Sequence, residues 1–134
     1  MKKTIITAAS VVLIIIIGFF SAYFITTSPK NSGEFCVDEF SAEIEQFAFT
    51  DDENYGNISD YKSAAKVGRT VIDDSFGKNS NGSIFKWMGC DVQYDPQNEI
   101  YHVRIYHVDP NVKGGAYNAI IKSNGTILAI WGEK

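Results

Sequence analysis

Two histidines are the residues best suited to acid–base chemistry, and they lie five positions apart in a stretch that alternates like a β-strand: His102 and His107. Side chains five positions apart on a strand point to opposite faces of its sheet, so these two cannot easily share a metal ion or form one dyad. His102 could instead pair with Asp91 or Asp95 as a general base and its orienting group, as in an isomerase-like enzyme. The simpler interpretation is a structural histidine half-buried on the sheet.

No other catalytic or ligand-binding motif accompanies this histidine. The chain has no G-x-S-x-G element, no phosphate-binding or dinucleotide-binding glycine loop, and no zinc-like spacing of its cysteines. The acidic run Asp51-Asp52-Glu53 lacks the spaced oxygen ligands of a calcium loop and is interpreted as a solvated loop. We therefore expect no catalytic residue, no cofactor and no metal, and the protein is predicted not to be an enzyme.

Protein binding has better support, because aromatic side chains supply rigid contact area and carboxylates complement a basic partner. The residues predicted to bind a partner are two aromatic residues and three acids near the strand ends: Asp91, Asp95, Glu99, Tyr101 and Trp131. Trp87 and Tyr106 are further aromatic candidates, and the alternative is that most of these rings are core. Residues 1–33 contain three lysines and no acid, so the rest of the chain carries nine basic and sixteen acidic residues, a net charge of −7. This charge favours a basic protein partner over nucleic acid, although solubility alone would also explain it.

The element that must position these residues is a β-hairpin at the C-terminal end. Two apolar, β-branched runs flank Asn124-Gly125, which is typical of a two-residue type I′ turn. That turn predicts Ile121 opposite Leu128 and Ala119 opposite Ile130. One face of the hairpin is then wholly apolar, so recognition would have to use the other face, around Asn118, Lys122 and Trp131, or the loops beyond the ends of the hairpin.

Two helices and two more strands complete the predicted domain. The apolar spacing from Val37 to Phe47 predicts an amphipathic helix, and the stripe from Tyr61 to Phe76 predicts a second, with Ser59 as its N-cap and Gly77 as its stop. Strands are predicted at 91–95 and 99–108. The expected fold is α+β, with two helices packed on a curved four-stranded antiparallel sheet, cystatin-like or nuclear-transport-factor-2-like.

The N-terminus is predicted to be a signal anchor. Residues 4–28 contain no charge, and about 22 residues in a helix reach about 33 Å, which spans a hydrocarbon core. We expect a transmembrane helix over residues 1–27, in contact with lipid through residues 4–27, a tether over 28–35 and the domain over 36–134. Lysines before the apolar run place that domain on the periplasmic or extracellular side of the cytoplasmic membrane. A cleaved signal peptide and a buried helix in a soluble protein are the alternatives.

The two cysteines, Cys36 and Cys90, are expected to form a disulfide. An even cysteine count in an exported domain is typical of such a bond, and two unpaired core thiols are the alternative.

Several stretches of the chain resemble one known family. The helix Tyr61–Gly77, the strand residues Val92-x-Tyr94-Asp95 and Asn98-x-Ile-Tyr-x-Val103, Gly114-Gly115 and the hairpin Ile120–Ile130 resemble bacterial immunity proteins with a nuclear-transport-factor-2-like fold. The resemblance implies a protein that binds and neutralises a cognate toxin of a polymorphic toxin system without catalysis. The predicted signal anchor would place this protein on the membrane, facing outward. The alternative is a PepSY-like envelope domain that binds a ligand or modulates a protease.

Overall fold

The structure, a computed structural model, describes residues 15–17, 19, 27–77, 88–109, 111 and 115–134. Its elements follow in the order β1 (Pro29–Glu34), η1 (Val37–Phe40), α2 (Ser41–Gln46), α3 (Tyr61–Phe76), β2 (Gly89–Asp95), β3 (Ile100–Tyr106), β4 (Tyr117–Lys122) and β5 (Ile127–Gly132). The α+β class predicted from the sequence is confirmed.

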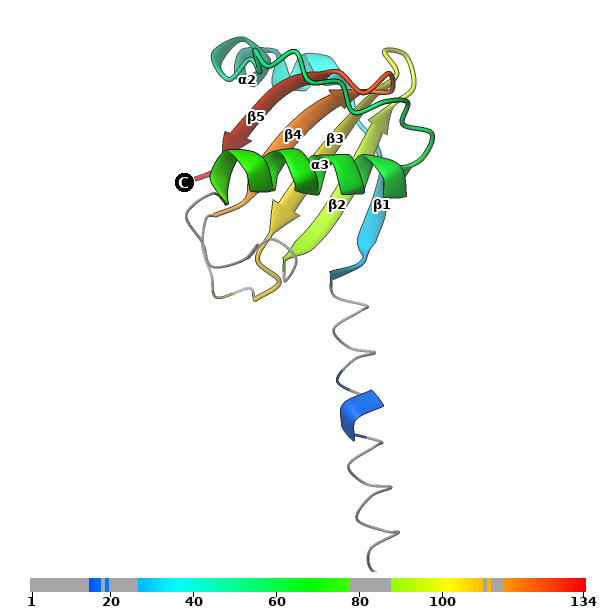
Figure 1. The fold of residues 1–134 in the computed structure, drawn as a ribbon, viewed down its shortest axis with the longest axis vertical. Coiled ribbons are helices and arrows are strands. Elements are labelled where there is room, and N and C mark those ends of the chain that lie inside the picture. The colour runs from blue at the N-terminus through cyan, green and yellow to red at the C-terminus, as the bar shows by residue number, and fades with distance from the viewer. Residues whose placement is uncertain (1–14, 18, 20–26, 78–87, 110, 112–114) are drawn as a thin grey trace, which may run out of the picture.

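All five strands form one sheet in the order β1-β2-β3-β4-β5 (Figure 1). The pairs from β2 to β5 are antiparallel, as the predicted meander requires, but β1 pairs with β2 in parallel. The predicted four-stranded antiparallel sheet is therefore wrong, because the sheet has five strands and is mixed. The fifth strand comes from residues 29–34, which the sequence predicts to be a tether.

The amino-acid composition of β1 does not predict a strand. Its sequence, PKNSGE, contains residues that are rare in strands, and all but its first residue are exposed. The strand pairs through its backbone, with Pro29 opposite Cys90 and Lys30 opposite Asp91. Arg69, a residue of α3 (Tyr61–Phe76), also fixes the start of this strand. Its guanidinium donates to the carbonyl oxygens of Thr27 at 2.8 Å and Met88 at 3.1 Å.

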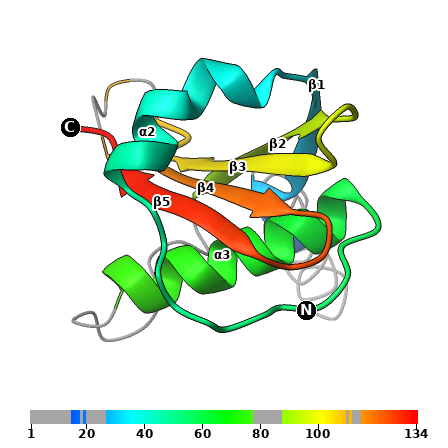
Figure 2. The ribbon, with the colours of Figure 1, turned by 90° about the horizontal axis from the view of Figure 1, so that it is seen from above.

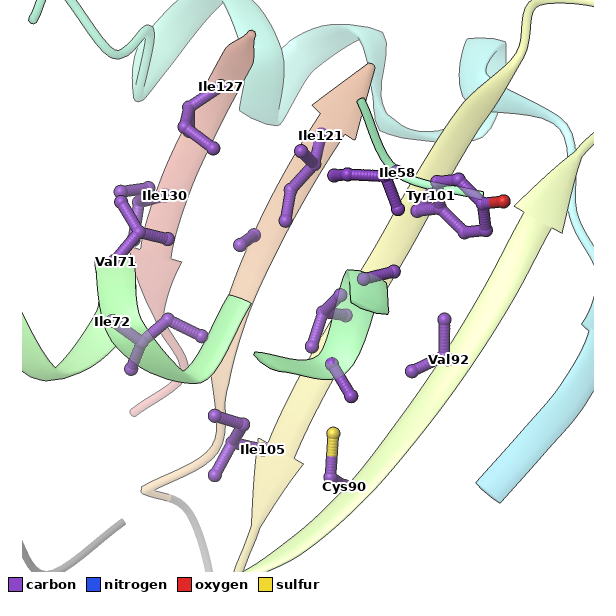
Figure 3. Close-up of a cluster of buried hydrophobic side chains, with 14 of the residues drawn as sticks. Ile58, Val71, Ile72, Cys90, Val92, Tyr101, Ile105, Ile121, Ile127 and Ile130 are labelled. Atoms are coloured by element: carbon purple, nitrogen blue, oxygen red, sulfur yellow. The ribbon is translucent and has the colours of Figure 1, made fainter. Parts of the chain in front are cut away.

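Helix α3 covers one face of the sheet, and the main core lies between them (Figures 2 and 3). Its buried positions are small or branched residues, namely Ala64, Ala65, Gly68, Val71 and Ile72. A Cβ atom at residue 68 would lie 2.6 Å from a methyl carbon of Val103, so glycine permits the closest approach of helix to sheet. The N-cap is Asp60 and not Ser59, because the Asp60 carboxylate accepts a hydrogen bond from the Ser63 N–H at 2.7 Å.

The segment 35–49 covers part of the opposite face, so the sheet lies between two helical layers (Figure 2). The predicted first helix is in fact a 3-10 turn, η1, followed by the short helix α2. A second cluster forms under it from the sheet residues Ile100, Ile120, Ala129 and Trp131 and from the partly buried Phe35, Val37, Phe40, Ile44 and Leu128. The backbone of Phe47, Ala48 and Phe49 also pairs with the free edge of β5.

The C-terminal hairpin is present, but its turn differs from the predicted one. Gly125 has φ of 88°, and Asn124 does not have the positive φ that a type I′ turn requires. The Gly125 N–H donates to the Lys122 carbonyl, so the loop has three residues, and Ile121 pairs with Ile127. A bulge at Leu128 then restores the predicted pair of Ala119 with Ile130. Ile127 therefore packs under α3, and Leu128 packs in the other cluster.

The predicted membrane segment is not supported. Within the described residues, no helix is both long enough and apolar enough to cross a membrane. This finding contradicts the predicted transmembrane helix and the single-pass membrane location that depends on it. Residues 1–14, 18 and 20–26, on which that prediction rests, lie outside the described part of the chain.

The predicted disulfide is not formed, because both cysteines are free thiols. Cys36 is exposed and immediately precedes Val37, whose N–H donates to the Asp95 carboxylate at the end of β2. Cys90 is buried beneath α3, five residues earlier on the same strand, which is about 16 Å along it. A disulfide needs Cα atoms within about 7 Å of each other, so these two cannot pair in this fold.

Candidate functional site

Polar side chains gather on the sheet face that lies opposite α3, beside the part that segment 35–49 covers. Residues on this face line up across four strands, because Asp91 pairs with Arg104, Arg104 with Asn118, and Asn118 with Trp131. Hydrogen bonds and one cation–π contact join the polar members into one chain of side chains, which we call the polar strip: Gln93, His102, Asn118, Glu133, Arg104, Tyr106 and Asp91. The strip has a buried end and an exposed end.

His102 forms the buried end, with only 5% of its surface exposed. Three aromatic rings surround the imidazole: Phe40 at 4.5 Å, Phe35 at 5.7 Å, and Trp131 at 6.2 Å and nearly parallel to it. Its Nε2 lies 2.9 Å from Oδ1 of Asn118, and its Nδ1 lies 3.1 Å from the side-chain amide of Gln93. Burial lowers the pKa of His102, because a charged imidazolium would lose its hydration there.

Arg104 and Glu133 form the exposed end. The guanidinium donates to both carboxylate oxygens at 3.0 Å, and the two side chains are 40% and 39% exposed. The hydrogen bonds from Arg104 lower the pKa of Glu133. The Arg104 guanidinium carbon lies 5.6 Å from the centre of the Tyr106 ring, and the Tyr106 hydroxyl donates to Asp91 at 3.1 Å. Every group at this end is thus held in one orientation while it stays in contact with solvent.

Among the described residues, no carboxylate contacts the buried imidazole of the strip directly. Both ring nitrogens of His102 contact side-chain amides, so the alternative pairing with Asp91 or Asp95 does not occur. Tyrosine and arginine residues that pair with a carboxylate through two hydrogen bonds are typical of interface anchors. They supply contact area and directional hydrogen bonds, and they lose little side-chain entropy on binding. An exposed ion pair contributes only about 0–1 kcal/mol to folding, so the pairing of Arg104 with Glu133 contributes little to stability.

The structure does not bring the five predicted binding residues together. Asp91 lies in the polar strip, and Glu99 is exposed in the β2–β3 turn, where it adopts a φ of 55°. Asp95 is only 2% exposed and accepts hydrogen bonds from Asn98, Val37 and Gln97, which lower its pKa and fix the turn.

The two predicted aromatic residues lie in the two separate clusters. Tyr101 packs under α3 with its ring 4.6 Å from that of Tyr94, and Trp131 packs against Phe40 on the opposite face. Their exposed fractions, 6% and 8%, identify both as core residues. Trp87 lies outside the described residues.

Arg104 and Glu133 are absent from the residues predicted to bind a partner. The alternation of β3 places Arg104 on the same face as His102, but Glu133 follows the last strand and its partner depends on the register of two strand pairs. The one signal was the polar position Asn118 on an otherwise apolar hairpin, since Asn118 is buried and links His102 to Glu133.

No family model, no curated protein and no solved structure matches the chain. The fold and the polar strip together define a small α+β domain with a preorganised, partly exposed polar surface on its sheet.

Proposed function

We propose that this chain is a non-catalytic binding protein of the immunity class, which neutralises a cognate toxin by contact through the exposed end of the polar strip. The observation that carries this proposal is the fixed geometry of Arg104, Tyr106 and Glu133 on an accessible sheet face. The resemblance to immunity proteins suggests the class through the scaffold alone, since the motif residues in α3 and the hairpin are core and turn residues.

The physical reason is preorganisation. A side chain that is already immobile loses little entropy when a partner docks, so more of the contact energy appears as affinity. The strip supplies one cation and two carboxylates within a small area, and such a mixture discriminates between partners by charge pattern. The acidic balance of the domain favours a partner with a net positive surface.

The experiment is co-purification of the full chain with the product of the neighbouring gene, followed by titration of the two proteins. We expect a stable complex, and we expect Arg104→Ala and Tyr106→Ala to weaken it at least tenfold, the effect of an interface anchor. Lys62→Ala is the matched control, because Lys62 is an exposed cation on α3, away from the strip. The proposal fails if a toxin-bearing cell survives equally well without this protein, or if the strip variants bind like the control.

A further inference from the structure

Two adjoining clefts run along α3 on the side that faces segment 49–58. The first has a volume of about 410 Å³ and is lined by Phe49, Asp51, Glu53, Tyr55, Val71, Asp74 and Ser75. The second has a volume of about 340 Å³ and is lined by Tyr55, Asn57, Ile58, Ser63, Lys66, Val67 and Thr70. Because Tyr55 lines both, we treat them as one feature, the α3 groove.

The outer wall of the α3 groove is held by the β4–β5 hairpin. The N–H groups of Tyr55 and Ile58 donate to the carbonyl oxygens of Gly125 and Ser123, at 3.2 and 2.7 Å. A Cβ atom at residue 125 would collide with the Gly56 backbone, so the wall and the turn are in direct contact. A groove whose walls are fixed in this way is preformed, as most ligand sites are.

One end of the groove is strongly acidic. Asp51, Glu53 and Asp74 all line the first cleft, and the Tyr55 hydroxyl donates to Glu53 at 3.2 Å. Burial, the hydrogen bond to Glu53 and the surrounding carboxylates raise the pKa of Tyr55 to about 12. No three carboxylate, histidine or cysteine side chains among the described residues converge with the geometry of a metal site. The spread of the acids instead suits a longer organic cation that reaches several of them.

The second cleft, at the other end of the α3 groove, is not acidic. Its lining contains Lys66 and no carboxylate, and Ile58 and Val67 supply apolar surface. The lining residues of the two clefts are centred about six or seven positions apart on α3, which corresponds to about 10 Å. An extended chain covers that distance in about three residues.

We propose that the α3 groove binds an extended segment of a partner protein, with an arginine side chain in the acidic cleft and an aliphatic side chain about three residues away in the second cleft. An arginine guanidinium suits the acidic cleft because its planar set of N–H donors can bond more than one of the lining carboxylates at once, and its flat face can stack on the Tyr55 ring. Phe49 and Val71 cover its aliphatic stem. This surface lies on the α3 side of the sheet and does not depend on whether the polar strip binds a toxin.

The test uses the full-length, ¹⁵N-labelled chain and four synthetic peptides. The probes are acetyl-Arg-Gly-Gly-Val-amide and acetyl-Val-Gly-Gly-Arg-amide, because the direction of the segment is open, and the same two peptides with glutamate in place of arginine. We expect saturable amide shifts in residues 49–58 and 63–75 with at least one arginine peptide, and none with the glutamate peptides. Added salt should weaken the binding, since the attraction is between partly exposed charges.

Variants locate the arginine. Glu53→Gln with Asp74→Asn keeps the shape of the cleft and should weaken binding at least fivefold, whereas Asp52→Asn should not, because Asp52 is exposed and does not line the groove. A native amide spectrum for each variant shows that it is folded. Absence of saturable shifts, shifts confined to the polar strip, equal binding of the glutamate peptides or unchanged affinity of the double variant would each overturn the proposal.

Discussion

The side chains of His102 and Asn118 meet across strands β3 and β4, with Nε2 of the imidazole 2.9 Å from Oδ1 of the amide. The Asn118 amide nitrogen donates to Glu133 at 3.0 Å, so its oxygen must face the histidine. Nε2 therefore carries the proton, and in the neutral imidazole Nδ1 is an acceptor. The atom placed 3.1 Å from Nδ1 is Oε1 of Gln93, and two acceptors cannot share a hydrogen bond, so we assign the flipped orientation of this amide, in which its nitrogen donates to Nδ1. One carboxylate at the surface thus fixes the tautomer of a buried ring.

The first prediction concerns pH. The folded state lowers the pKa of His102 below its ordinary value of 6.5, so the unfolded state binds protons more readily. The stability that this histidine contributes is complete above pH 6.5 and is lost as the pH falls through the folded pKa. Urea unfolding between pH 7.5 and 5 should therefore show a decline in the free energy of unfolding that His102→Gln makes shallower.

His107 provides the matched control for this measurement, since it is the only other histidine and is exposed. The variant His107→Gln should keep the wild-type slope. An unchanged slope in His102→Gln would show that other groups cause the decline.

The second prediction separates binding from stability at the exposed end of the strip. Because Arg104 and Glu133 are well exposed, Arg104→Ala should change the free energy of unfolding by less than about 1 kcal/mol. The same substitution should lower the affinity for the cognate partner strongly. Paired denaturation and binding measurements on one preparation test this, and a large loss of stability would mean that Arg104 serves the fold.

The third prediction concerns the contact between α3 and the sheet. Gly68→Ala adds a methyl group that would overlap the Val103 side chain, so we expect a loss of about 1–3 kcal/mol in thermal or denaturant unfolding. Val103→Ala removes two of the three overlapping carbon atoms and leaves the Cβ, which would lie 2.7 Å from the new methyl group, so it relieves the overlap in part. The double variant should therefore be less destabilised than the sum of the two single variants, and simple additivity would argue against this close approach.

The fourth prediction concerns the thiols. Cys36 is exposed and should react with a thiol reagent in the native protein, whereas Cys90 is buried and its pKa is raised to about 11, chiefly by that burial. We expect one reactive thiol per native chain and two after unfolding without reductant. Cys36→Ser should leave none in the native state. A chain that yields thiols only after reduction would contain the disulfide that this fold excludes.

The apolar periodicity of the sequence predicts α3 and the strands β3 to β5, but it predicts neither β1 nor the placement of the helical layers. The stripe on α3 and the alternation of β3, β4 and β5 are strong signals, because each buries a continuous apolar face. Strand β1 has no such face, so only its backbone partner defines it. Both helical layers were visible, but their placement on opposite faces depends on the path of segment 35–49 along the edge of β5.

The candidate sites show the same division. The acids at 51–53 resemble a solvated loop in the sequence, and they become one end of a groove only because α3 brings Asp74 beside them. Tyr101 and Trp131 looked like surface anchors because strand alternation does not reveal that helical segments cover both faces of this sheet.

The β4–β5 hairpin has a three-residue loop and a bulge at its tip, where the same sequence is also compatible with a second register. A two-residue turn without a bulge would use the same residues, would exchange the faces of Ile127 and Leu128, and would leave every pair from Ala129 onward unchanged. A slip of one residue could therefore occur at the tip without disturbing the rest of the sheet. The hydrogen bonds from Asn54, Tyr55 and Ile58 to the turn select one of the two registers. The segment that forms the outer wall of the α3 groove therefore also fixes the register of the hairpin tip.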